Sequence, residues 1–183
     1  MQATRGTPLS STDPTEAKPS HSSRHRLLFV VVALAAYAVD LGTKLLAVAH
    51  LNPDDPRNVV GGLLRLDLVR NPGAAFSTGT SYTLILSVIA LVAAGVVIRF
   101  GRRLGDRTWA VALGLLLAGV CGNLTDRVFR APGFLRGHVV DFLELPHWPV
   151  FNVADMLIDS AVLLIVIQTW RGIGIAGARR PTS

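Results

Sequence analysis

The sequence has a single cysteine and few charged residues. Cys121 alone can form neither an internal disulfide nor an all-cysteine metal site, and its apolar neighbours predict a packed, inert thiol. Charged side chains make up 16% of the 183 residues, below the roughly 25% of soluble domains. Half of the chain is hydrophobic, and the mean hydropathy is +0.46. This composition predicts an integral membrane protein.

Several signatures of other function classes are also missing. The net charge is +6, but the arginines lie next to apolar segments instead of forming one basic face, so we expect no nucleic-acid partner. The zinc motif H-E-x-x-H is absent, no Ser–His pair has a convincing spacing, and His138 and His147 lie in a loop without a cysteine partner. We therefore expect neither a metal nor a cofactor, and the aspartates remain as reactive groups.

Four apolar runs are long enough to cross a bilayer, or nearly so, and they occupy residues 27–49, 82–98, 109–124 and 153–170. Arg24, His25 and Arg26 precede the first run as they would precede a signal peptide, but its length predicts a retained helix. Residues 1–23 are rich in Ser, Thr and Pro and predict a disordered tail. We expect residues 24–171 to form the four-helix membrane domain and residues 172–183 a basic tail.

The arginines also predict an orientation. Loop 99–107 carries four of them and both chain ends are basic beside their helices, whereas loops 50–81 and 125–152 each balance three arginines with three acids. Basic loops stay in the cytoplasm, so both termini are expected there and the other two loops outside. Leu64, Leu66 and Leu68 alternate with polar residues, which predicts strands. The expected fold class is thus an all-α integral membrane protein of four transmembrane helices, with a small extracytoplasmic β element in the 50–81 loop.

The stretch 119–159 concentrates polar residues between apolar runs. These residues are Asn123, Asp126, Arg127, Asp141, Asn152, Asp155 and Asp159. Ionisable groups at a bilayer edge lose hydration, so such a cluster favours a functional site over a simple helix exit. Two carboxylates that meet in a partly dehydrated pocket share a proton, and one can act as base while the other acts as acid. From chemistry alone, the pair could be any two of Asp126, Asp141 and Asp155.

The first apolar run contains a further pair of opposite charges. Asp40 and Lys44 are spaced i,i+4 and therefore share one helix face. Paired, they cost much less in lipid than either would alone. A structural ion pair and a role at the site both remain open.

Five short blocks, in order, make the chain resemble the bacterial lipoprotein signal peptidases (signal peptidase II). The blocks are Asp40-x-x-x-Lys44, Asn71-x-Gly-Ala-Ala-Phe76, Gly122-Asn-x-x-Asp-Arg127, Val139-Val-Asp-Phe142 and Phe151-Asn-x-Ala-Asp155. The resemblance covers the chain from Leu27 to about Gln168. The chain departs from the family pattern at Leu41, where Gln is usual, and at Ala118, where Gly is usual. Asp159 lies outside the motif.

The resemblance implies an intramembrane aspartic endopeptidase that removes signal peptides from prolipoproteins, just before a diacylglyceryl-modified cysteine. It implies Asp141 and Asp155 as the catalytic pair. The implied substrate-binding or supporting residues are Asp40, Lys44, Asn71, Gly73, Asn123, Asp126, Arg127 and Asn152. The implied partners are the prolipoprotein and membrane lipids. We also expect a location in the cell membrane, with the active site near its outer face, and a monomer.

The positions of the two implied catalytic residues suggest different roles. Asp155 starts a predicted helix, whose dipole favours an ionised carboxylate, whereas Asp141 follows Val139 and Val140 in an apolar loop that favours the protonated form. We therefore expect Asp155 as base and Asp141 as acid, with their carboxylates in contact directly or through one water. Asp126 is expected to pair with its neighbour Arg127.

Two other functions have to be weighed. A small proton-coupled carrier or channel could use the aspartates as a relay. However, a relay should cross the bilayer, whereas these residues gather at one face, and four spans without a repeat leave little room for alternating access. A scaffold for a membrane complex would tolerate Asp→Asn substitutions.

Overall fold

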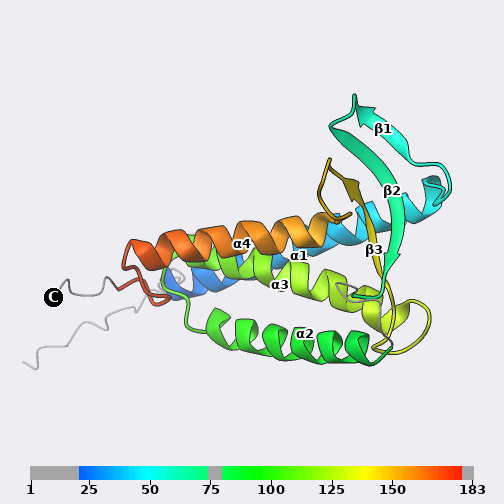
Figure 1. Ribbon diagram of the computed structural model, residues 1–183. Helices are drawn as coiled ribbons and strands as arrows, with labels where there is room; N and C mark the ends of the chain where they lie inside the picture. The colour runs from blue at the N-terminus through cyan, green and yellow to red at the C-terminus, as the bar shows by residue number, and fades with distance from the viewer. Residues whose placement is uncertain (1–20, 74–79, 179–183) are drawn as a thin grey trace, which may run out of the picture.

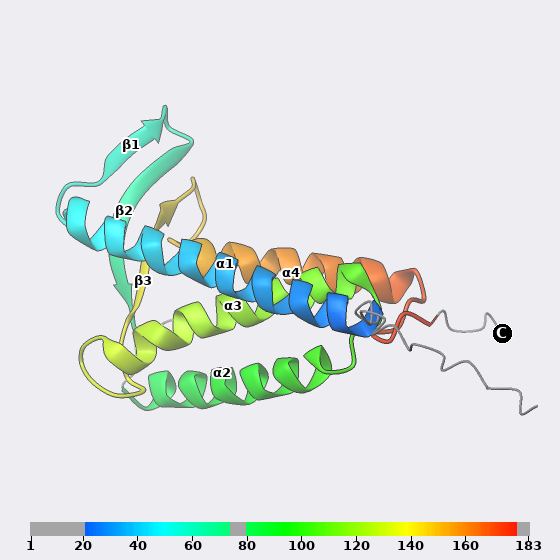
Figure 2. The same cartoon turned by 180° about the vertical axis from the view of Figure 1, so that it is seen from behind.

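Four long apolar helices form the body of the protein, in a computed structural model that describes residues 21–73 and 80–178. They are α1 (His21–His50), α2 (Thr80–Gly101), α3 (Arg107–Phe129) and α4 (Val153–Trp170). Each contains a stretch long and apolar enough to cross a membrane. The helices lie side by side in one bundle (Figures 1 and 2). The predicted four-helix membrane fold is confirmed.

Three helices are longer than hydropathy predicts, and α2 extends the predicted run 82–98 to Thr80–Gly101. α1 begins at His21, so residues 21–23 of the expected tail are helical, whereas the rest of that tail lies outside the described residues. α3 continues to Phe129, five residues past the predicted end. Its polar last turns have partners inside the bundle; for example, the Tyr37 hydroxyl lies 2.9 Å from Thr125 Oγ1. A helix can therefore continue where its lipid-facing hydropathy ends.

A three-stranded antiparallel sheet lies at one end of the bundle, in the order β1 (Arg57–Val60), β2 (Leu64–Asn71) and β3 (Val139–Glu144). The β1–β2 hairpin confirms the β element predicted within residues 50–81. β3 comes from the connection between α3 and α4, and it pairs Asp141 with Val69. The prediction that Asp141 lies in a loop is therefore wrong. Its strand forms through pairing with a partner about 70 residues earlier, which short apolar pairs on either side of Asp141 do not reveal.

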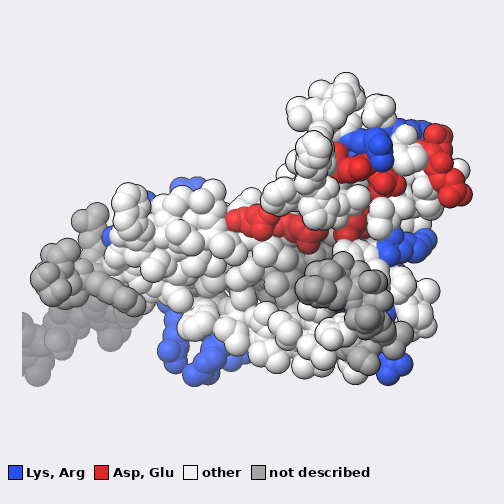
Figure 3. Space-filling model, viewed as in Figure 1, with Lys and Arg blue, Asp and Glu red and all other residues white. Residues whose placement is uncertain are grey.

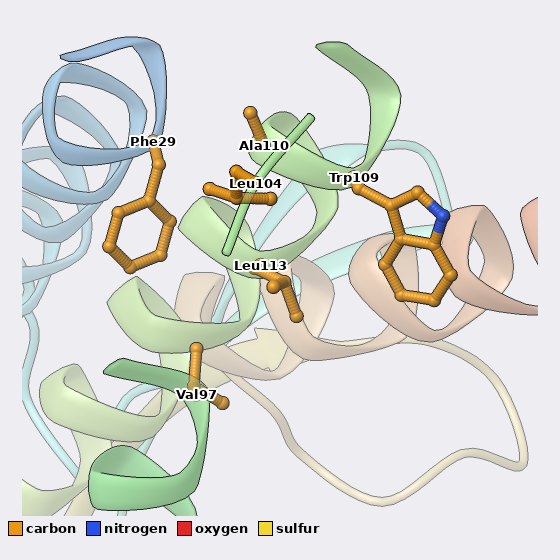
Figure 4. Close-up of a cluster of buried hydrophobic side chains, with 6 residues drawn as sticks. All are labelled: Phe29, Val97, Leu104, Trp109, Ala110 and Leu113. Carbon is orange, nitrogen blue, oxygen red and sulfur yellow. The ribbon is translucent and has the colours of Figure 1, made fainter. Parts of the chain in front are cut away.

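Separate apolar clusters fix the two ends of the bundle. At the sheet end, Leu68, Val140 and Phe142 pack against Ala47 of α1. At the other end the cluster consists of Phe29, Val97, Leu104, Trp109, Ala110 and Leu113 (Figure 4). The indole N–H of Trp109 also donates to the carbonyl of Ile173 at 2.9 Å, and Gly105 N donates to Ile175 O at 2.9 Å. Residues following α4 are thereby held against the α2–α3 connection.

Small residues on α3 allow its neighbours to approach closely. A Cβ atom at Gly119 would lie 2.5 Å from the carbonyl oxygen of Ala154 in α4, and one at Gly122 would collide with the Asp40 carboxylate of α1. Such contacts are too short for any side chain. These close contacts bring α1, α3 and α4 together beside the sheet.

The charge distribution leads to a topological prediction. Basic groups gather where α2 passes into α3, and acidic groups lie along the N-terminal half of α4 and on the sheet (Figure 3). We expect Val60→Cys, in the exposed hairpin, to react with a membrane-impermeant maleimide on intact cells. Arg103→Cys, which is also exposed, should react only after permeabilisation. Both variants need a Cys121→Ala background. The reverse labelling pattern would contradict the orientation.

Candidate active site

The polar residues of the five sequence blocks meet where the sheet joins the bundle. They come from α1 (Asp40, Lys44), β2 and the turn after it (Asn71, Gly73), α3 (Asn123, Asp126, Arg127), β3 (Asp141) and the start of α4 (Asn152, Asp155). Segments more than one hundred residues apart thus contribute to one site.

Asp141 is held on the buried side of this site. Asp141 is 2% exposed and lies between two buried residues of β3, Val140 and Phe142. Asn71 Nδ2 donates to Asp141 Oδ2 at 2.8 Å, and Asn152 Nδ2 donates to Oδ1 at 2.6 Å. Burial raises the pKa of the Asp141 carboxyl to about 6, although the two amide donors act in the opposite direction. Asp141 therefore retains a proton more readily than an ordinary aspartate.

Asp155 lies in a different environment, in the first turn of α4. It forms a capping box with Asn152: Asn152 Oδ1 accepts from Asp155 N at 3.2 Å, and Asp155 Oδ2 accepts from Asn152 N at 3.1 Å. Asn123 Nδ2 donates to its other oxygen, Oδ1, at 2.9 Å. The Asp155 carboxylate is thus held by two donors at the N-terminus of α4 and is partly exposed.

Asn152 connects the two carboxylates. Its side-chain amide donates to Asp141, and its backbone N–H donates to Asp155. The contact that we expect between the two carboxylates, directly or through one shared water, stays a prediction.

Asp126 pairs with residues other than the expected Arg127. Its carboxylate contacts Lys44 Nζ at 3.0 Å and the guanidinium of Arg130, and it accepts from Val140 N at 3.2 Å. Neighbouring residues on a helix point in different directions, whereas residues four apart share a face. Arg130 was missed in the sequence, although its i+4 spacing from Asp126 was the available signal.

Arg127 faces the turn after β2 instead. A Cβ atom on Gly73 would lie 3.5 Å from both terminal nitrogens of Arg127, and Gly73 itself has a φ of 97° that favours glycine. Gly73 N donates to Asn71 Oδ1 at 2.8 Å, which closes this turn. In the part of the chain that the structure describes, Arg127 Nη1 is buried without a hydrogen-bond partner. Among the described residues, the guanidinium therefore has one unpartnered nitrogen, close to Gly73.

Asp40 and Lys44 form the structural ion pair that was one of the two expected roles, and the role at the site stays a prediction. They form an ion pair of 3.0 Å with side chains only 1% exposed, and Lys44 Nζ also donates to Asn123 Oδ1 at 2.9 Å. The ion pair is thus buried, and its lysine contacts Asn123, which in turn donates a hydrogen bond to Asp155. Asp159, one turn after Asp155, is exposed, and none of the hydrogen bonds or ion pairs found in the described residues involves it.

The fold and the site define a multi-pass membrane protein with a pair of aspartates at one end of its bundle. Residues 32–171 match the family model of signal peptidase (SPase) II. The chain is 46% identical over 170 residues to a lipoprotein signal peptidase of Rhodococcus jostii (strain RHA1), covering 92% of this chain and 86% of that one. It is 48% identical over 162 residues to the lipoprotein signal peptidase of Mycobacterium avium (strain 104), covering 88% and 87%.

Solved structures agree with these relatives. A bacterial membrane enzyme determined by the in meso method at 1.9 Å resolution has a TM-score of 0.69 and 27% identity, over 77% of this chain and 91% of that one. A second such enzyme, at 2.3 Å resolution, has a TM-score of 0.66 and 26% identity, over 85% and 94%. The chain is therefore a bacterial multi-pass membrane peptidase. It belongs to the signal peptidase II family.

The raised pKa of Asp141 predicts how stability depends on pH. Between an ordinary pKa of 3.8 and about 6, the folded protein binds more protons than the unfolded chain. The stabilisation is fully present below the ordinary pKa and is lost as pH rises through about 6. It amounts to about 3 kcal/mol in total, from the usual 1.36 kcal/mol per pKa unit.

Thermal unfolding in detergent between pH 4 and 7 measures this dependence. Asp141→Asn should flatten the fall in Tm across that range, because it removes the titrating group. Asp159→Asn, which changes an exposed carboxylate on the same side of the protein, should keep the parent's slope. Equal slopes for the parent and Asp141→Asn would contradict the assignment.

Proposed function

We propose that this protein is an aspartic endopeptidase that removes the signal peptides of prolipoproteins, with Asp141 and Asp155 as its catalytic pair. The observation that carries the proposal is the arrangement of these two aspartates. They come from a strand and a helix start, share Asn152 as a hydrogen-bond donor, and have opposite environments. The similarity to named lipoprotein signal peptidases supports the reaction class and the substrate.

The different environments assign the two roles. Asp155, ionised at the start of α4, takes a proton from a water molecule, and the oxygen of that water attacks the scissile carbonyl carbon. Asp141, protonated in its buried position, donates a hydrogen bond or its proton to the carbonyl oxygen as negative charge develops there. The tetrahedral intermediate then collapses: a hydroxyl proton returns to Asp141 as the C=O bond re-forms, the C–N bond breaks, and Asp155 gives the proton that it took from water to the leaving nitrogen.

Burial decides the side from which water arrives. Asp141 is 2% exposed and Asp155 is half-buried, so water reaches the pair on the Asp155 side. Asn152 and Asn123 hold the two carboxylates from the protein side and leave the opposite side to the substrate. Arg127 Nη1, a buried donor with no partner among the described residues, supplies a hydrogen bond to a substrate carbonyl.

The substrate is a signal helix that stays in the bilayer and is cut just before a cysteine carrying a diacylglyceryl group. The site lies at one end of the membrane-spanning bundle, beside the first turn of α4. A lipid anchor confines the scissile bond to this depth, and such confinement supplies much of the positioning that amide hydrolysis requires. With the predicted orientation, this depth is the outer face of the membrane.

Substitution of the aspartates tests this proposal. Asp141→Asn and Asp155→Asn preserve shape but remove the titrating group, so each should lower the cleavage of a lipidated precursor by about 10³-fold or more without unfolding the protein. Asp126→Asn should leave measurable activity, because an amide oxygen can still accept from Lys44 and from Val140 N. The matched unlipidated precursor should be cut poorly by the parent enzyme.

Two results would be decisive against the assignment. If Asp126→Asn is inactive while Asp141→Asn still cleaves, the catalytic pair includes the wrong aspartate. If all three variants cleave normally, the protease proposal fails as a whole.

A further inference from the structure

Lys44 occupies the centre of the buried polar network, and we propose that it is the positioning residue for both catalytic aspartates. The inference rests on the proposed function. The ammonium group of Lys44 contacts Asp40 at 3.0 Å, Asp126 at 3.0 Å and Asn123 Oδ1 at 2.9 Å. The contact to Asn123 is a hydrogen bond, and the contacts to the two carboxylates are ion pairs. Each of these three partners in turn binds Asp155 directly or the backbone N–H group just before Asp141 or Asp155.

The first connection runs through Asp40 to Asp155. Asp40 Oδ1 accepts from the backbone N–H of Ala154 at 2.8 Å, and Ala154 directly precedes Asp155. This carboxylate from α1 thus satisfies a free N–H in the first turn of α4, where the helix dipole also favours a negative charge. Gly122 of α3 has no side chain, so the Asp40 carboxylate fits between α3 and the first turn of α4. This close packing holds Asp40 against the Ala154 N–H group.

The second connection runs through Asp126 to Asp141. Asp126 Oδ2, the oxygen that contacts Lys44, accepts from the backbone N–H of Val140 at 3.2 Å. Val140 directly precedes Asp141 in β3. The same ammonium group therefore holds two carboxylates, each of which binds the backbone N–H immediately before a catalytic aspartate.

The third connection sets the orientation of an amide. Asn123 Oδ1 accepts from Lys44, so its Nδ2 is directed to Asp155 Oδ1 at 2.9 Å. A rotated amide would place an N–H donor against the ammonium and an oxygen against the carboxylate, and both contacts would be repulsive. Lys44 thereby keeps a donor on the oxygen of the residue proposed as base.

This network has a positive group at its centre because two buried carboxylates need compensation. Asp40 and Lys44 are 0% exposed and Asp126 is 2% exposed. Arg130, at the edge of the cluster, provides the second positive charge on Asp126. Loss of Lys44 alone leaves buried carboxylates without their shared partner, so a single variant risks misfolding.

A charge-compensated variant avoids that problem. In Asp40→Asn/Lys44→Met/Asp126→Asn, amide oxygens can still accept from Ala154 N and Val140 N, but the ammonium that fixes all three groups is gone. The test uses the full-length protein in lipid nanodiscs and a lipidated precursor peptide. The folded fraction is measured by thermal unfolding, and kcat is expressed per folded molecule.

We expect kcat of this variant to fall about 100-fold, with KM within about threefold of the parent, because misplacement of reacting groups by about 1 Å costs that much. The matched control is Gln168→Met, which removes another buried polar contact between helices, the 2.8 Å hydrogen bond from Gln168 to Asp106 at the far end of the bundle. The control should lose thermal stability but keep its kcat per folded molecule.

A triple variant that folds and retains the parent's kcat would overturn the positioning role. The same result with inactive Asp141→Asn and Asp155→Asn would leave the proposed function intact. Active Asp141→Asn and Asp155→Asn enzymes would instead refute the proposed function itself. If the triple variant does not fold, Asn123→Ala provides the second measurement. It deletes the oriented amide alone, and an unchanged kcat for it would contradict the third connection.

Discussion

One buried ammonium group connects the parts of this protein that contain its reactive residues. Lys44 reaches from α1 to two carboxylates and one amide, and these in turn bind α3, β3 and the start of α4. A charge at this depth is stable only while its partners stay in place, and removal of one partner of a buried pair typically costs roughly 3–5 kcal/mol. The geometry of the site and the stability of the bundle therefore depend on the same contacts.

That shared framework supports two aspartates with different surroundings. Asp141 belongs to a buried strand, and burial raises its pKa, whereas Asp155 belongs to a helix start and is partly exposed. The buried strand shields the Asp141 carboxyl group from water. The helix start surrounds Asp155 with oriented N–H dipoles that take the place of water. Asn152 links the two groups without making them equivalent.

Local patterns in the sequence predicted the four spans, the β1–β2 hairpin and the Asp40–Lys44 pair, because hydropathy, period-two alternation and i,i+4 spacing are local signals. They did not predict β3, whose strand character comes from pairing with β2. They also paired Asp126 with the adjacent Arg127, although the helix directs these side chains apart. The contacts from Asp40 to Ala154 N and from Asp126 to Val140 N use backbone donors, which have no signature in the sequence.

The most direct test of the central claim is a structure with a transition-state mimic. A lipidated precursor peptide with a hydroxyethylene group in place of the scissile amide carries a tetrahedral hydroxyl that resembles the attacking water. The account predicts that this hydroxyl lies within hydrogen-bond distance of both Asp141 and Asp155, with Asp126 still bound to Lys44. A hydroxyl bound to Asp126, or one that contacts neither Asp141 nor Asp155, would contradict it.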